Sequence, residues 1–162
     1  MKLFTHATRL FIAAVLMALP LAGSAAEHKQ GDEPALMEPV KSVLDHYLMI
    51  QTELAKDSTK GLNEHANAIA KAVRGDEMKM LSPAVATQAE TLAKAKDLKA
   101  ARAAFKPLST SLAKYLADNK AGKGAYHEVY CPMAKASWLQ KGTDIKNPYM
   151  GKEMLDCGTL KN

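Results

Sequence analysis

The sequence predicts a mainly α-helical fold: an antiparallel four-helix bundle followed by a small C-terminal lobe that contains a short strand and turns. Three observations predict it. Hydrophobic residues make up 48% of the 162 residues but aromatic residues only 6%, which favours helices over a β-sandwich. Apolar residues recur at spacings of three and four across residues 40–119. After that point both cysteines occur among methionines and aromatic residues. The length suits one domain.

Residues 1–26 have the pattern of a cleavable signal peptide. Lys2 and Arg9 precede an apolar run that ends in small residues. The uncharged stretch 10–26 is 17 residues long, which is short for a membrane span. We therefore expect export to the periplasm and a mature protein without a membrane span, with an uncleaved anchor as the alternative. Removing the signal would lower the net charge from +5 to +3, too weak a charge to indicate nucleic-acid binding.

Residues 27–39 are polar, contain Gly31 and Pro34, and are predicted to be a flexible leader. The first helix should begin at Val40 and end at Asp57-Ser58. The second should begin near Thr59 and stop at Gly75. The buried stripe of these two helices is expected to comprise Val40, Val43, Leu44, Tyr47, Leu48, Gln51, Leu54, Leu62, Ala66, Ile69, Ala70 and Val73.

The third helix should open at Ser82-Pro83, a capping residue followed by proline, and run to about Lys96. Asp97 should cap the fourth helix, and Pro107 inside that helix is expected to kink it. Residues 119–124 form a linker rich in Lys and Gly. The bundle therefore spans residues 40–119 and the lobe residues 120–162, together one domain.

His46 and His65 lie on neighbouring predicted helices, beside the apolar stripes. They are interpreted either as partly buried structural histidines or as a metal-binding pair. No helix carries an acidic residue three positions before a histidine, as a di-iron bundle would. No Cys-x-x-Cys-His motif for covalent haem is present. Phosphate-binding loops, nucleophile elbows and recognisable carboxylate pairs are also missing from the sequence, so we expect no enzyme activity.

The lobe contains the candidate metal ligands. Cys131 and Met133 are two residues apart and can share one side of an extended segment. Met154 and Cys157 are three apart and can share one side of a helical turn. If the turn at Asn147-Pro148 folds the second pair onto the first, four sulfurs converge. Such a set selects soft ions, Cu(I) or Ag(I) above all. His127 and Met150 are alternative ligands, and the more distant Met78-Lys79-Met80 is a further candidate.

A disulfide between Cys131 and Cys157 is the competing interpretation, because the periplasm is oxidising. A reactive redox thiol is a third, weakened by the lack of a Cys-x-x-Cys motif. A bridge or a shared ion requires the two cysteines to lie close together. The lobe is too short to bury its aromatic residues alone, so Tyr130, Trp138 and Tyr149 are expected to pack on the bundle.

The sequence resembles a bacterial family of domains of unknown function, DUF3347, over nearly all of the mature chain. In the lobe the resemblance rests on Tyr130-Cys131-Pro132-Met133-Ala134, Trp138-Leu139 and the set Ile145, Asn147, Pro148, Tyr149, Gly151, Met154, Leu155, Cys157 and Gly158. In the helices it rests on Tyr47, Leu48, Gln51, Leu54, Asp57, Leu98, Arg102, Phe105, Leu108 and Ser109.

Members of that family also occur fused to adaptor subunits of heavy-metal efflux pumps, so the resemblance implies metal handling in the periplasm. The predicted function is therefore that of an exported protein that binds Cu(I) or Ag(I), for buffering or for delivery to an efflux adaptor or another envelope protein. The alternative is a disulfide-stapled interaction domain, without metal, that docks on an envelope partner.

Overall fold

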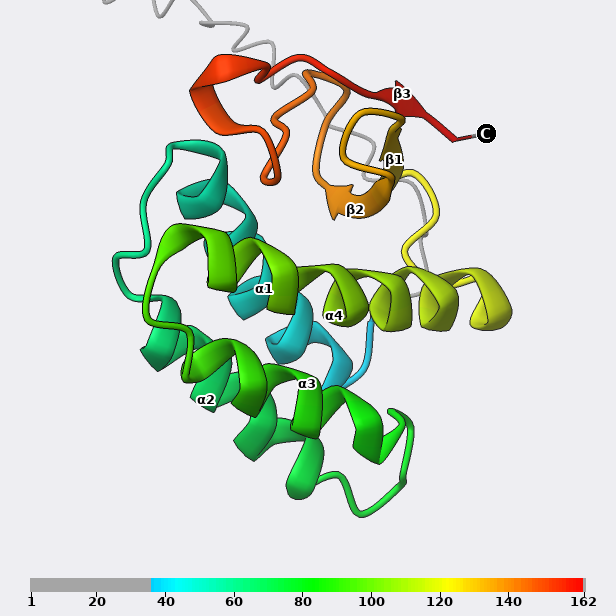
Figure 1. Cartoon of the computed structure of the whole chain (residues 1–162). Coiled ribbons are helices and arrows are strands. Elements are labelled where there is room, and N and C mark those ends of the chain that lie inside the picture. The colour runs from blue at the N-terminus through cyan, green and yellow to red at the C-terminus, as the bar shows by residue number, and fades with distance from the viewer. Residues whose placement is uncertain (1–35, 162) are drawn as a thin grey trace, which may run out of the picture. The chain divides into compact units, whose positions relative to one another are not determined.

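The structure is a computed structural model that describes residues 36–161. The predicted signal peptide and residues 27–35 of the predicted leader lie outside the described residues. The described part is mainly helical, with four helices and a small sheet (Figure 1). The elements are α1 (Val40–Ala55), α2 (Leu62–Arg74), α3 (Pro83–Ala93), α4 (Leu98–Asn119), β1 (His127–Cys131), β2 (Ala136–Gln140), the short 3-10 helix η1 (Gly151–Glu153) and β3 (Thr159–Leu160).

The helix starts and stops follow the capping residues of the sequence. The Asp97 carboxylate accepts the Ala100 N–H at 2.7 Å, and the Ser82 hydroxyl accepts the Ala84 N–H at 3.3 Å. Gly75 ends α2, as predicted. These caps satisfy backbone groups that would otherwise lack partners at the helix ends.

Two predicted boundaries differ by about a turn. Helix α2 begins at Leu62 instead of Thr59, because Gly61 stands before it in a left-handed conformation with φ of 70°. Helix α3 ends at Ala93 instead of Lys96, and its last carbonyls bond the Lys94 N–H. Helix α4 continues through Pro107 as one element of 22 residues. No helix among residues 36–161 is long and apolar enough to cross a membrane.

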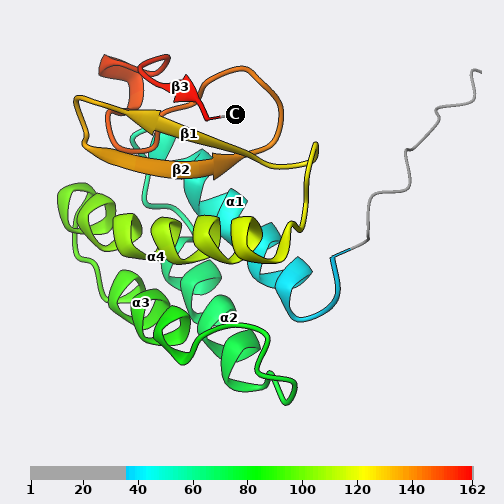
Figure 2. The same cartoon turned by 90° about the vertical axis from the view of Figure 1, so that its right-hand side faces the viewer.

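The lobe contains three strands where the sequence predicted one. Strand β1 lies in the middle, antiparallel to β2 on one side and to β3 on the other. A four-residue turn joins β1 to β2, so that Cys131 pairs with Ala136 and His127 with Gln140. Helices α4 and α1 contact β2, and α2 and α3 pack against each other (Figure 2). The sheet therefore rests on the helices through β2.

Aromatic side chains join the lobe to the helices. Tyr47 of α1 stacks on Phe105 of α4 with ring centroids 4.9 Å apart. Tyr149 lies 6.0 Å from Phe105 and 6.0 Å from Trp138, and Trp138 is completely buried. The prediction for Tyr149 is confirmed by its contact with Phe105 of α4. Trp138 is buried, but its side-chain contacts with Tyr149 and Gln140 lie within the lobe. The prediction for Tyr130 is wrong: its side chain is 39% exposed, because neighbouring strand residues point to opposite faces and Val129 and Cys131 take the buried one.

Polar side chains reinforce this junction. The Tyr47 hydroxyl accepts the Leu139 N–H of β2 at 3.0 Å and is hydrogen-bonded to the Ser109 hydroxyl at 2.8 Å. Burial raises the pKa of Tyr47 well above its usual value, so the phenol stays neutral. Gln51, also buried, donates from Nε2 to the Lys146 carbonyl at 2.6 Å. Each of these groups finds a partner, as buried polar groups require.

Candidate thiol site and the adjoining cleft

The two cysteines of the lobe lie side by side. Their Sγ atoms are 2.7 Å apart, which is longer than a disulfide bond of about 2.05 Å and shorter than the usual contact of two separate sulfur atoms. Cys131 ends β1 and is fully buried, whereas Cys157 is partly exposed and follows a turn in which its N–H bonds the Met154 carbonyl at 3.1 Å. The prediction that these residues are neighbours is confirmed, across 26 positions of sequence.

Asn147 holds the segment that returns Cys157 to Cys131. This side chain is completely buried and donates from Nδ2 to the Cys157 carbonyl at 2.6 Å. Its Oδ1 accepts the N–H groups of Tyr149 and Met150, at 2.8 and 3.1 Å. The Asn147 N–H in turn donates to the Leu155 carbonyl at 2.8 Å. The turn predicted at Asn147-Pro148 thus folds back because one amide side chain bonds both of its arms.

The surroundings of the thiols shift the pKa values of the two cysteines in opposite directions. Burial alone would raise the pKa of Cys131, but hydrogen bonds from the Cys157 thiol, the Ala134 N–H and the Asn147 side chain outweigh it and lower that pKa. The Ala134 N–H lies 3.4 Å from the Cys131 sulfur. The same hydrogen bond raises the pKa of Cys157, which keeps its proton as the donor. The pair therefore releases its first proton more readily than its second.

The other predicted ligands are placed differently. Met133 follows Cys131 in the β1–β2 turn and is 65% exposed, and Met154 begins the turn that carries Cys157. His127 stands at the opposite end of β1, about 13 Å from Cys131 at the usual rise per residue. The structure thus brings the two thiols together and keeps His127 apart from them, because the strand between is extended. No group of three or more His, Cys, Asp or Glu side chains suited to a metal ion occurs within residues 36–161.

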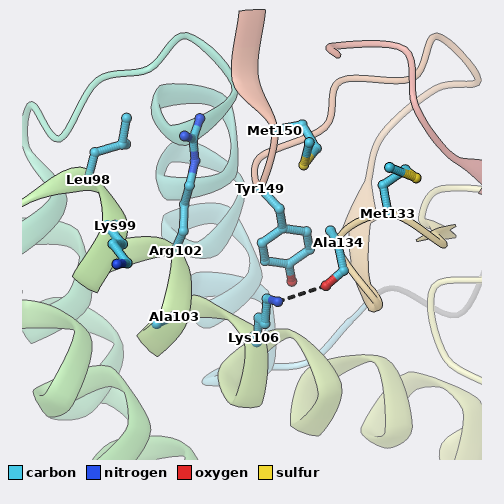
Figure 3. Close-up of a pocket in the computed structure, with 9 residues that line it drawn as sticks. All are labelled: Leu98, Lys99, Arg102, Ala103, Lys106, Met133, Ala134, Tyr149 and Met150. Carbon is cyan, nitrogen blue, oxygen red and sulfur yellow. Dashed lines mark hydrogen bonds between the residues drawn. The ribbon is translucent and has the colours of Figure 1, made fainter. Parts of the chain in front are cut away.

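A cleft of about 570 Å³ adjoins the thiol site (Figure 3). Its charged side chains, Lys99, Arg102 and Lys106, come from one face of α4, and Met133 and Met150 come from the loops opposite. The Lys106 ammonium donates to the Ala134 carbonyl at 2.7 Å. The cleft was missed at the sequence level, although basic residues at spacings of three and four on one helix were the available signal.

The histidines of the helices also meet. The Nδ1 atoms of His46 and His65 are 3.0 Å apart, and both rings are partly buried. Met78, by contrast, is 70% exposed in the segment between α2 and α3. The structure therefore brings together two of the pairs that the sequence singled out, the cysteines and the histidines.

A family model matches about half of this chain. No curated protein and no solved structure matches the chain significantly. The family model, described as "Protein of unknown function (DUF3347)", matches residues 43–124. The match runs from α1 to the segment after α4 and ends before β1, so the thiol pair lies outside it. The chain belongs to the DUF3347 family of proteins of unknown function.

Proposed function

We propose that this protein is exported to the periplasm and binds Cu(I) or Ag(I) through Cys131 and Cys157. The observation that carries the proposal is the proximity of the two cysteine sulfurs, 2.7 Å apart, one residue buried and the other partly exposed. The helices, interpreted as an antiparallel four-helix bundle, serve as the scaffold that supports the lobe. Buffering of the ion, or its delivery to a heavy-metal efflux adaptor, is the role we assign.

The donor set fits a soft monovalent ion better than a hard or a four-coordinate one. Thiolates select Cu(I), whereas Mg²⁺ and Ca²⁺ prefer oxygen. A structural zinc site needs four protein ligands, and no third His, Cys, Asp or Glu joins the two cysteines within residues 36–161. The lowered pKa of Cys131 eases the loss of the proton that binding of the ion displaces.

Binding requires the thiols to separate. With metal–sulfur bonds of about 2.3 Å, two sulfurs on opposite sides of an ion lie about 4.6 Å apart. Cys131 is fixed at the end of β1, so Cys157, in the loop before β3, is the residue that moves. Met154 is in the same turn as Cys157, and Met133 directly follows the Cys131-Pro132 segment. Their thioethers are the additional soft ligands of the proposal.

Titration of the reduced protein with Cu(I), without oxygen and against a competing chelator, tests the site. Replacing Cys131 and Cys157 with alanine should abolish high-affinity binding. Replacing Met133 and Met154 should weaken it, while the control Met78→Ala with Met80→Ala, which removes as many thioethers elsewhere, should leave it unchanged. Affinity should fall as the pH is lowered, because protons compete for the thiolates. Unchanged affinity of the double cysteine variant would show that the site is elsewhere.

The cleft favours a second candidate function, a disulfide-stapled interaction domain. Its lining combines the ammonium groups of Lys99 and Lys106 with exposed Met133, whereas Arg102 is already paired with Asp57. Such a surface suits a short acidic segment of an envelope protein. A covalent Cys131–Cys157 bond would fix the β1–β2 turn that forms one wall. Mass spectrometry of protein alkylated directly in periplasmic extracts separates the two functions. Free thiols with bound copper support the metal proposal, and a stable bridge supports the interaction domain.

A further inference from the structure

We propose that His46 and His65 form a second metal site, for a divalent transition-metal ion with Cu(II) bound most tightly. This site is independent of the thiols: it lies between α1 and α2, whereas the cysteines belong to the lobe. Imidazole suits Cu, Zn and Ni, and affinity at nitrogen sites rises along that row of metals to Cu(II).

The distance between the two nitrogens supports the assignment. The Nδ1 atoms are 3.0 Å apart. With metal–nitrogen bonds of about 2.0 Å, adjacent ligands lie about 2.8 Å apart in a square plane and about 3.3 Å apart in a tetrahedron. The observed separation falls between these two values. The ring centroids are 5.2 Å apart and the ring planes 41° apart, so each Nδ1 corner faces the other ring. A bound ion therefore requires both rings to turn about χ2, a broad torsion in histidine.

Buried residues before and after each histidine on its helix fix the distance between the two imidazoles. Val43 and Ile50, one turn before and one turn after His46, are completely buried. Leu62 and Ile69 have the same relation to His65 and are 3% exposed or less. Each histidine thus stands between two core residues on its helix, and the packing of α1 against α2 holds the two imidazoles opposite each other. The two histidines are thus held close together before the ion arrives, which limits the entropy lost on binding, and only the rings have to turn.

The pair is also reachable. Both histidines are only partly buried, so an ion can enter from solvent and keep water in its remaining positions. A plain hydrogen bond between the rings explains the same distance without a metal. The two interpretations differ in the expected effect of replacing either histidine with asparagine. An asparagine keeps a hydrogen-bonding nitrogen near the Nδ1 position but is a much poorer ligand for Cu(II) than imidazole.

The experiment uses the full chain with Cys131→Ala and Cys157→Ala, so that the thiols neither reduce nor capture the ion. Cu(II) binding is followed by competition titration and by electron paramagnetic resonance. His46→Asn and His65→Asn should each weaken this site by more than about 100-fold, because even outer-shell partners of metal ligands contribute 10- to 100-fold. The control His127→Ala, which removes an imidazole far from the pair, should bind as the parent does.

Thermal unfolding completes the test. Cu(II) should raise the melting temperature of the parent and of His127→Ala, but not of the two asparagine variants, since only binding to the folded state stabilises it. Without metal all four proteins should melt alike. If the asparagine variants keep the number of Cu(II) ions, the affinity and the resonance spectrum of the parent, the histidines form a hydrogen-bonded pair and the proposal is wrong. This result would not affect the thiol proposal.

Discussion

At the scale of single side chains, an ion pair between Asp57 and Arg102 connects the loop of the lobe to the helices. The Arg102 guanidinium donates to the Asp57 carboxylate at 2.6 Å, to the Pro148 carbonyl at 2.8 Å and to the Leu54 carbonyl at 3.1 Å. The second oxygen of Asp57 accepts the Lys152 N–H at 3.1 Å. One ion pair thus joins the end of α1, the start of α4 and the segment from Pro148 to Lys152.

Asp57→Asn should destabilise the protein at neutral pH. The hydrogen bonds from Arg102 and from the Lys152 N–H lower the pKa of Asp57. A lowered pKa stabilises the folded state above the unfolded-state value of about 3.9. That stabilisation is lost as the pH falls through the lower folded-state pKa. The difference in unfolding free energy between wild type and Asp57→Asn should therefore shrink below about pH 4, as measured by urea unfolding at several pH values.

Asp118→Asn is the matched control, because Asp118 pairs with Lys114 at a site where both side chains are more than half exposed. Its unfolding free energy should differ little from that of wild type at neutral pH. An equal effect of the two substitutions would contradict the assigned role of the Asp57–Arg102 pair.

Trp138→Ala should destabilise the protein by roughly 3–5 kcal/mol, the cost of removing a large aromatic side chain from a core. Trp138 is completely buried, and its indole N–H donates to the Gln140 Oε1 at 3.0 Å. Met133→Ala, in the same lobe but 65% exposed, should change the free energy by less than about 0.5 kcal/mol. Urea unfolding followed by circular dichroism measures both. Equally small changes in unfolding free energy for both variants would show that the stability of the lobe does not depend on its aromatic contacts.

At the scale of elements, η1 is possible only because its first residue has no side chain. Gly151 has φ of 58°, a conformation that favours glycine. A Cβ at this position would overlap the Asp57 carboxylate and the Arg102 guanidinium. The glycine therefore lets the loop approach the ion pair closely enough for the Lys152 N–H to bond Asp57.

Gly151→Ala should therefore lower the free energy of unfolding by more than backbone strain alone would. Gly142→Ala is the matched control, because Gly142 has φ of 73° but nothing within 4 Å of an added Cβ. The control should cost about 1–2 kcal/mol, the strain of a left-handed alanine. Gly151→Ala should exceed it clearly, because it also displaces the Asp57–Arg102 pair. Thermal and urea unfolding of the two variants provide the comparison, and equal costs would count against the close approach.

At the scale of the whole molecule, the thiol pair links stability to oxidation. Cys131 and Cys157 lie 26 positions apart, on either side of β2 and η1. A bond between them would constrain the unfolded chain, so the oxidised protein should be about 3 kcal/mol more stable than the reduced one. Urea unfolding with and without reductant measures this difference. The double alanine variant should show no dependence on reductant. Equal stability of oxidised and reduced wild type would contradict the expectation.

The sequence by itself determined the four helices and those of their ends that a capping residue or Gly75 marks. Ser82, Gly75 and Asp97 act through their own backbone and the next few residues, so local patterns were sufficient to place them. It also selected the two cysteines and predicted their proximity, because either interpretation of the pair required it. The boundary at Gly61 was predicted wrongly, because hydrophobic periodicity does not encode a left-handed glycine. The placement of Tyr130 was predicted wrongly, because the alternation that buries Val129 and Cys131 was not applied to the residue between them.

Only the tertiary structure decided which distant residues meet. Sequence spacing allowed His127 to join the thiols, but the extended β1 carries it about 13 Å away. The sequence likewise left His46 and His65 open between a structural role and a metal pair, and the packing of α1 on α2 places their nitrogens 3.0 Å apart. Periodicity reports which face of an element is buried, whereas the partner of that face is set by how all the elements pack together.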